Sequence, residues 1–116
     1  MQYLLLLTYR PEDNTPPGPE LDAEMKVWGE LTDEMRQAGV WVAAAGLTSD
    51  SATTVRAPAG DTVITDGPYA ETKEVLFSFI VIDVEDLDAA IAWAEKAPAV
   101  KYGSVEIRPM DRLELK

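Results

Sequence analysis

Two segments of this chain are apolar on both of their alternating faces, and they constrain the fold more than any other feature. They are QYLLLLTYR at 2–10 and VLFSFIVIDV at 75–84. A strand with one face in water alternates apolar with polar residues, whereas these segments offer apolar side chains to two sides. Simple alternation places Phe77, Phe79 and Val81 on one face of the second segment. The sequence therefore predicts two central strands of a sheet, each covered on both sides.

Helical and strand patterns fill the rest of the chain. Apolar residues recur at steps of four and three from Leu21 to Ala38, which predicts a helix, and Gly39 suits its C-terminal cap. A second helix is predicted over 85–98, where acidic residues open the segment and Pro98 closes it. Further strands are predicted at 40–47, at 52–57 and 61–65 as a hairpin that turns at 58–60, and at 103–109.

The order of these elements predicts one α+β domain over residues 1–116, a split β-α-β sandwich of the ferredoxin-like type. In that architecture both helices cover the same side of the sheet, so the other side is open in a monomer. Because the two central strands are apolar on both faces, the open side needs a cover. The simplest cover is the sheet of a second copy, and we expect a homodimer.

The composition excludes several kinds of chemistry. The chain has no cysteine and no histidine, which rules out disulfides, zinc ribbons, thiol nucleophiles and Ser-His-Asp systems. Acid–base chemistry would need carboxylates, Lys, Tyr or water with displaced pKa values. No spaced carboxylate motif argues for a metal, and no cofactor is expected.

Charge and hydropathy predict which partners the protein lacks and in which compartment it is found. The net charge of −11 repels a phosphate backbone, so neither nucleic acid nor an anionic membrane is expected as a partner. No window is apolar for long enough to span a membrane, and the first residues lack the pattern of a secretory signal. We expect a cytoplasmic protein.

The segment TDGPYAETKE at 65–74 is the candidate site. Its plain interpretation is a turn, because Asp66 can accept backbone hydrogen bonds while Gly67 and Pro68 set the backbone angles. The functional interpretation is that this rigid turn aims Asp66, Tyr69 and Glu71 into a cleft as catalytic groups. Lys73 would bind ligand there, unless the charged residues form only a solvated cluster.

Two arginines are further candidates for ligand binding. Arg10 ends the first central strand, where it would either contact a ligand or pair with an acid. Arg108 shares a strand face with Glu106, so it either forms a local charge pair or lines a cleft on the open side of the sheet.

Three motifs in order resemble a known family. DGPYAETKE at 66–74, VIDVEDLDAAIAWA at 81–94 and YGSVEIRP at 102–109 follow an opening MQYLLLLTY, and together they are similar to YCII-related proteins of the DGPF subgroup. The resemblance covers nearly the whole chain. It implies a dimeric α+β barrel, in which two ferredoxin-like units pair sheet to sheet. It also implies a possible accessory role beside an extracytoplasmic-function sigma factor.

The chain departs from the family pattern in ways that bear on catalysis. YciI-type relatives carry a histidine and aspartate pair suspected of catalysis, and this chain has no histidine. Tyr69 stands where the subgroup usually has Phe, and Ala45 where a glutamate is often found. Phe77 and Ser78 replace a frequent Gly-Gly pair, and the bulk of Phe77 is expected to shrink a cavity.

Two functional hypotheses follow from the sequence. In the first, a homodimer binds a small molecule in a polar cleft near the DGPY segment and carries out acid–base chemistry without histidine. In the second, the protein is a non-catalytic interaction module that regulates a partner such as a sigma factor. A buried Asp66 or Glu71 with a displaced pKa that faces a concave cavity favours the first, and a filled cavity with an exposed apolar patch favours the second.

Overall fold

A computed structural model describes residues 1–48, 51–67 and 74–114 of the chain. Its elements in chain order are β1 (Gln2–Tyr9), the 3-10 turn η1 (Pro11–Asp13), α1 (Pro19–Gln37), β2 (Trp41–Gly46), β3 (Thr53–Arg56), β4 (Val63–Asp66), β5 (Val75–Asp83), α2 (Leu87–Ala94), α3 (Ala99–Tyr102) and β6 (Gly103–Pro109). Four strands form a sheet in the order β2-β5-β1-β6, and all neighbouring pairs are antiparallel. β3 and β4 form a separate hairpin.

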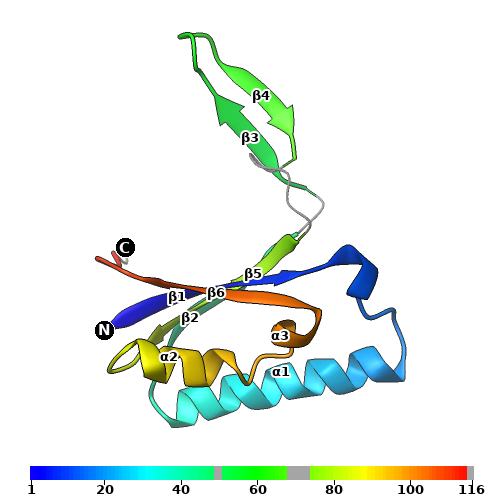
Figure 1. Ribbon diagram of the computed structural model, residues 1–116, viewed down its shortest axis with the longest axis vertical. Coiled ribbons are helices and arrows are strands. Elements are labelled where there is room, and N and C mark those ends of the chain that lie inside the picture. The colour runs from blue at the N-terminus through cyan, green and yellow to red at the C-terminus, as the bar shows by residue number, and fades with distance from the viewer. Residues whose placement is uncertain (49–50, 68–73, 115–116) are drawn as a thin grey trace.

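This strand order confirms the predicted ferredoxin-like α+β fold. The two apolar segments, β1 and β5, are the two central strands, as their composition indicated. Figure 1 shows α1, α2 and α3 on one side of the sheet, with the β3–β4 hairpin rising from the other. We call the side without helices the outer face.

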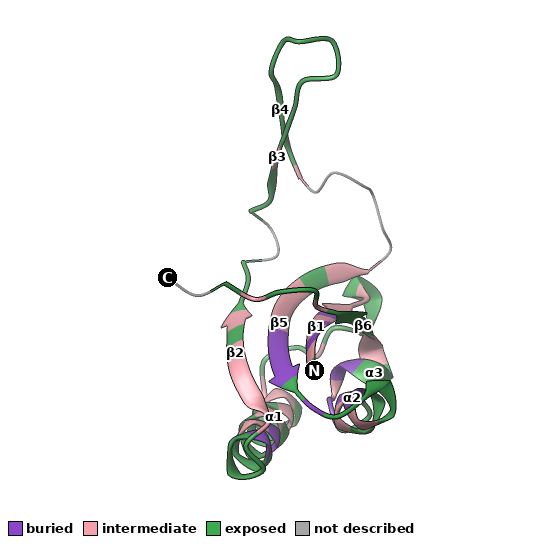
Figure 2. Ribbon diagram, turned by 90° about the vertical axis from the view of Figure 1, so that its left-hand side faces the viewer, coloured by how far each residue is buried: buried purple, intermediate pink, exposed green. Residues whose placement is uncertain are grey.

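The hydrophobic core lies between the sheet and the helices. Alternate residues of β1 point into it, because Tyr3, Leu5 and Leu7 are buried while their neighbours are half-buried. Leu31 and Met35 of α1 complete the core from the helical side. Figure 2 shows the buried positions gathered where the sheet meets the helices.

A β-bulge changes which face Phe77 occupies. Leu7 of β1 is opposite Ser78, but the next residue, Thr8, is opposite Leu76, so Phe77 is the extra residue in β5. Phe77 consequently packs against Trp28 of α1, with 6.1 Å between the ring centroids. The prediction that Phe77 shares a face with Phe79 is therefore wrong, because the bulge interrupts the alternation of the strand.

The helix termini follow the sequence signals. Gly39 has φ of +74° just after α1, as expected for a C-terminal cap. The carboxylate of Asp86 accepts a hydrogen bond from the Ala89 amide at 2.9 Å and caps α2. The second helix stops before Pro98, as predicted, but it already ends at Ala94, and Pro98 is the N-cap of α3.

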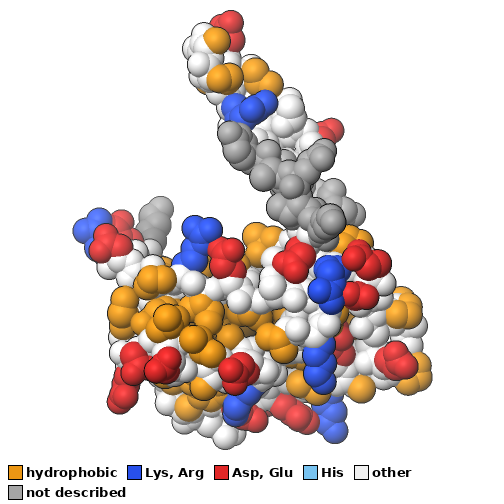
Figure 3. All heavy atoms as spheres, in the orientation of Figure 1, with side chains coloured by type: hydrophobic (Ala, Val, Ile, Leu, Met, Phe, Trp, Pro, Cys, Tyr) orange, Lys and Arg blue, Asp and Glu red, His pale blue; other side chains and the backbone are white. Residues whose placement is uncertain are grey.

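The β3–β4 hairpin extends away from the body of the protein (Figure 1). Val55 and Ile64 lie opposite each other across the two strands, and they are 63% and 66% exposed. Figure 3 shows apolar side chains on this projection as well as on the body. The hairpin therefore presents apolar side chains that its own chain does not cover. No helix of the described residues is long and apolar enough to cross a membrane.

Candidate functional site

Three polar side chains from distant parts of the chain meet on the outer face. Thr8 lies in β1, Ser104 lies in β6, and Glu74 immediately precedes β5. The Ser104 hydroxyl donates to Glu74 Oε2 at 2.6 Å, and the Thr8 hydroxyl lies 2.9 Å from the same oxygen. The two hydroxyl oxygens are 2.8 Å apart, and the Ser104 amide donates to Thr8 Oγ1 at 3.1 Å. We call these three residues the Glu74 cluster.

The pairing of β1 with β6 places this cluster. Thr8 and Ser104 are opposite each other in a register that runs without a break from Tyr3 to Tyr9. Because side chains alternate along a strand, Thr8 shares the outer face with half-buried Leu4 and Leu6. The cluster therefore lies at one end of the outer face, next to the apolar side chains that β1 contributes to that face.

The cluster holds the Glu74 side chain in its charged form. Hydrogen bonds from Ser104, and then from Thr8, hold the pKa of the Glu74 carboxyl below its ordinary value of 4.5, and the charge of Arg10 acts in the same direction. Partial burial acts in the opposite direction, less strongly than either hydrogen bond but more strongly than the charge of Arg10. At neutral pH Glu74 is thus an oriented anion that accepts hydrogen bonds and attracts positive charge.

Arg10 connects the end of β1 to the last residues of α3. Its Nε atom pairs with Asp13 at 2.6 Å, and its backbone amide donates to the Tyr102 carbonyl at 2.8 Å. The guanidinium also lies 3.4 Å from the Lys101 carbonyl oxygen. The prediction that Arg10 pairs with an acid is confirmed, and its role in ligand binding stays a prediction.

Arg108 forms the local charge pair that its position indicated. Its Nε atom lies 2.5 Å from Glu106 Oε2, and both side chains are more than half exposed. The pair stands on the outer face, because Glu106 is opposite Leu6 and Arg108 is opposite Leu4. A contact between Arg108 and a ligand stays a prediction.

The DGPY segment is described only at its two ends. Asp66 is exposed at the last position of β4, and Gly67 follows with φ of +104°. Gly67 is anchored through its amide to the Ala52 carbonyl and through its carbonyl to the Thr54 hydroxyl, both at 2.6 Å. The predicted site residues Tyr69, Glu71 and Lys73 lie outside the described residues.

The sequence does not predict the Glu74 cluster, although Glu74 ends the DGPYAETKE motif. The charged residues of that motif are also typical of a solvated surface cluster. Thr8 and Ser104 gave only a weak signal, namely a hydroxyl on each of two strands. Their meeting depends on a strand pairing between residues 96 positions apart.

Aromatic side chains fill the helical side of the sheet near the same end. Phe77 lies 5.8 Å from the ring of Tyr9, 6.1 Å from Trp28 and 6.4 Å from Tyr102. The space that a Gly-Gly pair would leave at this place is thus occupied. Any ligand of the Glu74 cluster must approach from the outer face.

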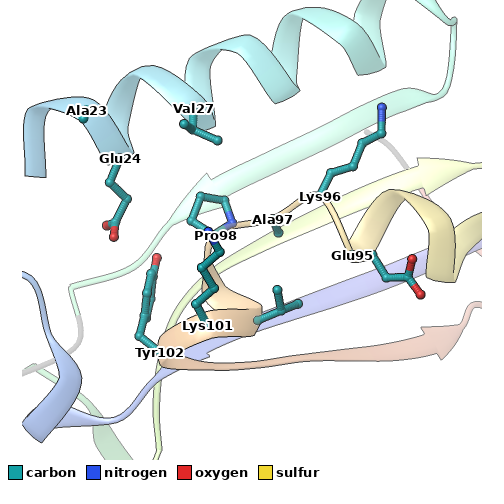
Figure 4. A pocket seen from close by; sticks show the side chains of 10 residues that line it. Ala23, Glu24, Val27, Glu95, Lys96, Ala97, Pro98, Lys101 and Tyr102 are labelled. Atoms are coloured by element: carbon teal, nitrogen blue, oxygen red, sulfur yellow. The ribbon is translucent and has the colours of Figure 1, made fainter. Parts of the chain in front are cut away.

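A cavity of about 410 Å³ lies elsewhere, between α1 and α3 on the helical side (Figure 4). None of the three residues of the Glu74 cluster lines it. Within the described ranges, no group of three or more acidic residues stands close enough together to hold a metal ion.

Comparisons with known proteins give one family and one similar fold. A family model described as the YCII-related domain matches residues 1–114. An uncharacterised protein of Rhizobium meliloti (strain 1021) is 44% identical over 62 residues, which are 52% of this chain and 50% of that protein. The matched segment thus spans about half the length of this curated relative.

Among solved structures, a 5-chloro-2-hydroxyhydroquinone dehydrochlorinase from Burkholderia phenoliruptrix AC1100, in complex with 2,5-dihydroxybenzoquinone, is similar in fold. The TM-score is 0.50 at 13% sequence identity, over 96% of this chain and 94% of that one.

Proposed function

This chain belongs to the YCII-related domain family, and we propose that it is a homodimer that binds a small hydroxylated molecule at the Glu74 cluster. The observation that carries the proposal is the carboxylate of Glu74, which two hydroxyl groups orient on the open face of the sheet. An oriented carboxylate at the end of an apolar surface suits a ligand with an apolar body and hydrogen-bond donors at its rim.

A dimer would turn this open surface into a cleft. Leu4, Leu6 and Phe79 are half-buried apolar side chains of the outer face, and leaving them in water costs about 25 cal/mol per Å². A second sheet packed against them would put walls around the cluster. This arrangement is the dimeric α+β barrel that the resemblance to the DGPF subgroup implies.

The DGPY segment adds the proposed catalytic groups. It begins at Asp66 and ends at Glu74, and only its ends are described. We place Asp66, Tyr69 and Glu71 as proposed acid–base residues, with Arg10, Lys73 and Arg108 as proposed ligand contacts. Since Glu74 is charged at neutral pH, its part in such chemistry is to bind and orient a donor group rather than to give up a proton.

The test is calorimetry with hydroxyhydroquinone, kept reduced under argon, against the dimer. This probe carries hydroxyl donors on an apolar ring, and the fold neighbour's name includes a chlorinated form of it. We expect Glu74→Gln to weaken binding about tenfold, because a charge-assisted hydrogen bond is lost. Tyr69→Phe and Glu71→Gln should weaken it further without lowering thermal stability.

Two controls make this test specific. Glu30→Gln removes an exposed carboxylate from α1, on the helical side of the sheet and outside the proposed site, and should leave binding unchanged. The ring with its hydroxyls methylated has no donors and should not bind. Equal binding of hydroxyhydroquinone to wild type and Glu74→Gln would refute the proposed site.

A second candidate function is an interaction module, and the β3–β4 hairpin favours it. Its exposed apolar pair, Val55 and Ile64, is what a protein-binding arm would present. A cytoplasmic partner such as an extracytoplasmic-function sigma factor would cover it. Binding of a purified sigma factor that Val55→Asp abolishes, in a variant that stays folded, would favour this function over the first.

A further inference from the structure

The groove between α1 and α3 combines apolar walls with a charged end. Ala23, Glu24 and Val27 of α1 face the segment 95–102, and the groove between them has a volume of about 410 Å³. That volume lies in the range of small-molecule sites, about 300 to 1,000 Å³. The groove is on the helical side of the sheet, so it is independent of the Glu74 cluster.

Three polar side chains converge at one end of the groove. Figure 4 shows Glu24 reaching down from α1 and Tyr102 rising toward it from α3, with the Lys101 side chain next to Tyr102. The Thr15 hydroxyl donates to Glu24 Oε1 at 3.1 Å, which holds the carboxylate at the mouth of the groove. A negative charge, a positive charge and a phenol hydroxyl thus line the same groove.

The walls of the groove are apolar and open to water. Val27 and Val100, one on each side, are 44% and 45% exposed, while Ala97 between them is buried. Water is thus in contact with apolar side chains that a ligand could cover. Burial of an apolar group there would be favourable.

The other charged groups of the groove do not compete for a ligand at this end. Lys96 is paired with Glu34 of α1 at 2.7 Å. Glu95 lines the opposite end, and its carboxylate points away from Glu24 (Figure 4). The recognition end therefore consists of Glu24, Lys101 and Tyr102.

We propose that this groove binds an α-amino acid with an apolar side chain. The ligand ammonium pairs with Glu24, its carboxylate accepts from Lys101 and the Tyr102 hydroxyl, and its side chain lies along Val27, Ala97 and Val100. A ligand with only one charge would satisfy only one of the two charged groups. A zwitterion satisfies both and is not repelled by the net charge of −11.

The Tyr102 hydroxyl is protonated, as the proposed hydrogen bond to the ligand carboxylate requires. Burial raises the pKa of its hydroxyl above the ordinary value of 10.0, and the negative charge of Glu24 acts in the same direction, while a hydrogen bond with Trp28 opposes them. The hydroxyl consequently keeps its proton over the physiological range and can donate to a carboxylate.

The test is a titration of the isotope-labelled protein with L-leucine, followed by amide and methyl NMR shifts. We expect saturable shifts at Val27, Ala97 and Val100 in the range of about 1 mM, as for a small ligand with few contacts. Two analogues of leucine separate its charges, since 3-methylbutylamine lacks the carboxylate and 4-methylpentanoate lacks the ammonium. Each should bind at least about tenfold more weakly than leucine.

Variants of Glu24 and Lys101 test which side chain binds the ligand ammonium and which binds the ligand carboxylate. Glu24→Gln should weaken leucine about tenfold and leave 4-methylpentanoate unaffected, whereas Lys101→Gln should weaken leucine and leave 3-methylbutylamine unaffected. Glu95→Gln is the matched control, because it makes the same chemical change in the same groove away from the recognition end. The free spectra of all variants report whether they are folded.

Two results would overturn the proposal. One is the absence of saturable shifts at the groove with leucine at about ten times the expected dissociation constant. The other is equal leucine binding by wild type, Glu24→Gln and Glu95→Gln. Loss of binding in Glu24→Gln but not in Glu95→Gln would support it, whatever hydroxyhydroquinone does at the Glu74 cluster.

Discussion

Ser104 donates its hydroxyl to Glu74 Oε2 over 2.6 Å, and this contact joins the last strand of the sheet to the end of the DGPY motif. Thr8, in the strand between them, contacts the same oxygen. One carboxylate thus holds together three parts of the chain that are distant in sequence.

The first prediction concerns the protonation of this carboxylate. Ser104→Ala removes the strongest cause of its shift, so the pKa of Glu74 should rise toward 4.5, and Thr8→Val should have a smaller effect in the same direction. A carbon-detected NMR titration of the glutamate carboxyls measures this. An unchanged Glu74 titration in Ser104→Ala would contradict the hydrogen bond.

The second prediction is the acid stability that follows from the same shift. A carboxyl whose folded pKa is below its unfolded value stabilises the fold above the unfolded value, about 4.5 here, and loses this effect as pH falls through the folded pKa. The stability difference between wild type and Glu74→Gln should therefore shrink below about pH 4.5. Denaturant unfolding at a series of pH values checks this, with Glu106→Gln as the exposed control.

The third prediction concerns the close approach of β6 to β1. A Cβ atom on Gly103 would stand 2.0 Å from the Thr8 carbonyl oxygen, so Gly103→Ala should destabilise the fold by about 3 kcal/mol. A Cβ atom on Gly29, inside α1, would have no other atom within 4 Å. Gly29→Ala should therefore stabilise the fold by about 1 kcal/mol. Urea unfolding compares the two; a neutral Gly103→Ala would show that β6 can move away from β1.

The fourth prediction separates the two faces of β5. Phe79→Glu places a charge on the outer face and should turn the proposed dimer into a folded monomer. Phe77→Ala, on the helical side, should instead lower stability by about 3 kcal/mol without changing the oligomeric state. Sedimentation equilibrium and thermal unfolding distinguish these outcomes. A wild-type protein that is monomeric at micromolar concentration would refute the dimer.

Much of the fold could be predicted from the sequence because its signals are local. The 103–109 strand alternates apolar and polar residues, and the structure has β6 at these positions. The side of Phe77 could not be predicted, since the bulge depends on how β5 pairs with β1. The Glu74 cluster was missed for the same reason, because each of its residues is ordinary until three strands bring them together.

The central position of β1 has a consequence for the synthesis of the protein. β1 leaves the ribosome before its two partners, β5 and β6, which begin only at Val75 and Gly103. Its apolar QYLLLLTY segment therefore stays unpaired until most of the chain has been translated. Such a segment is a target for chaperones and for aggregation, so slower translation of the C-terminal third should lower the yield of soluble protein.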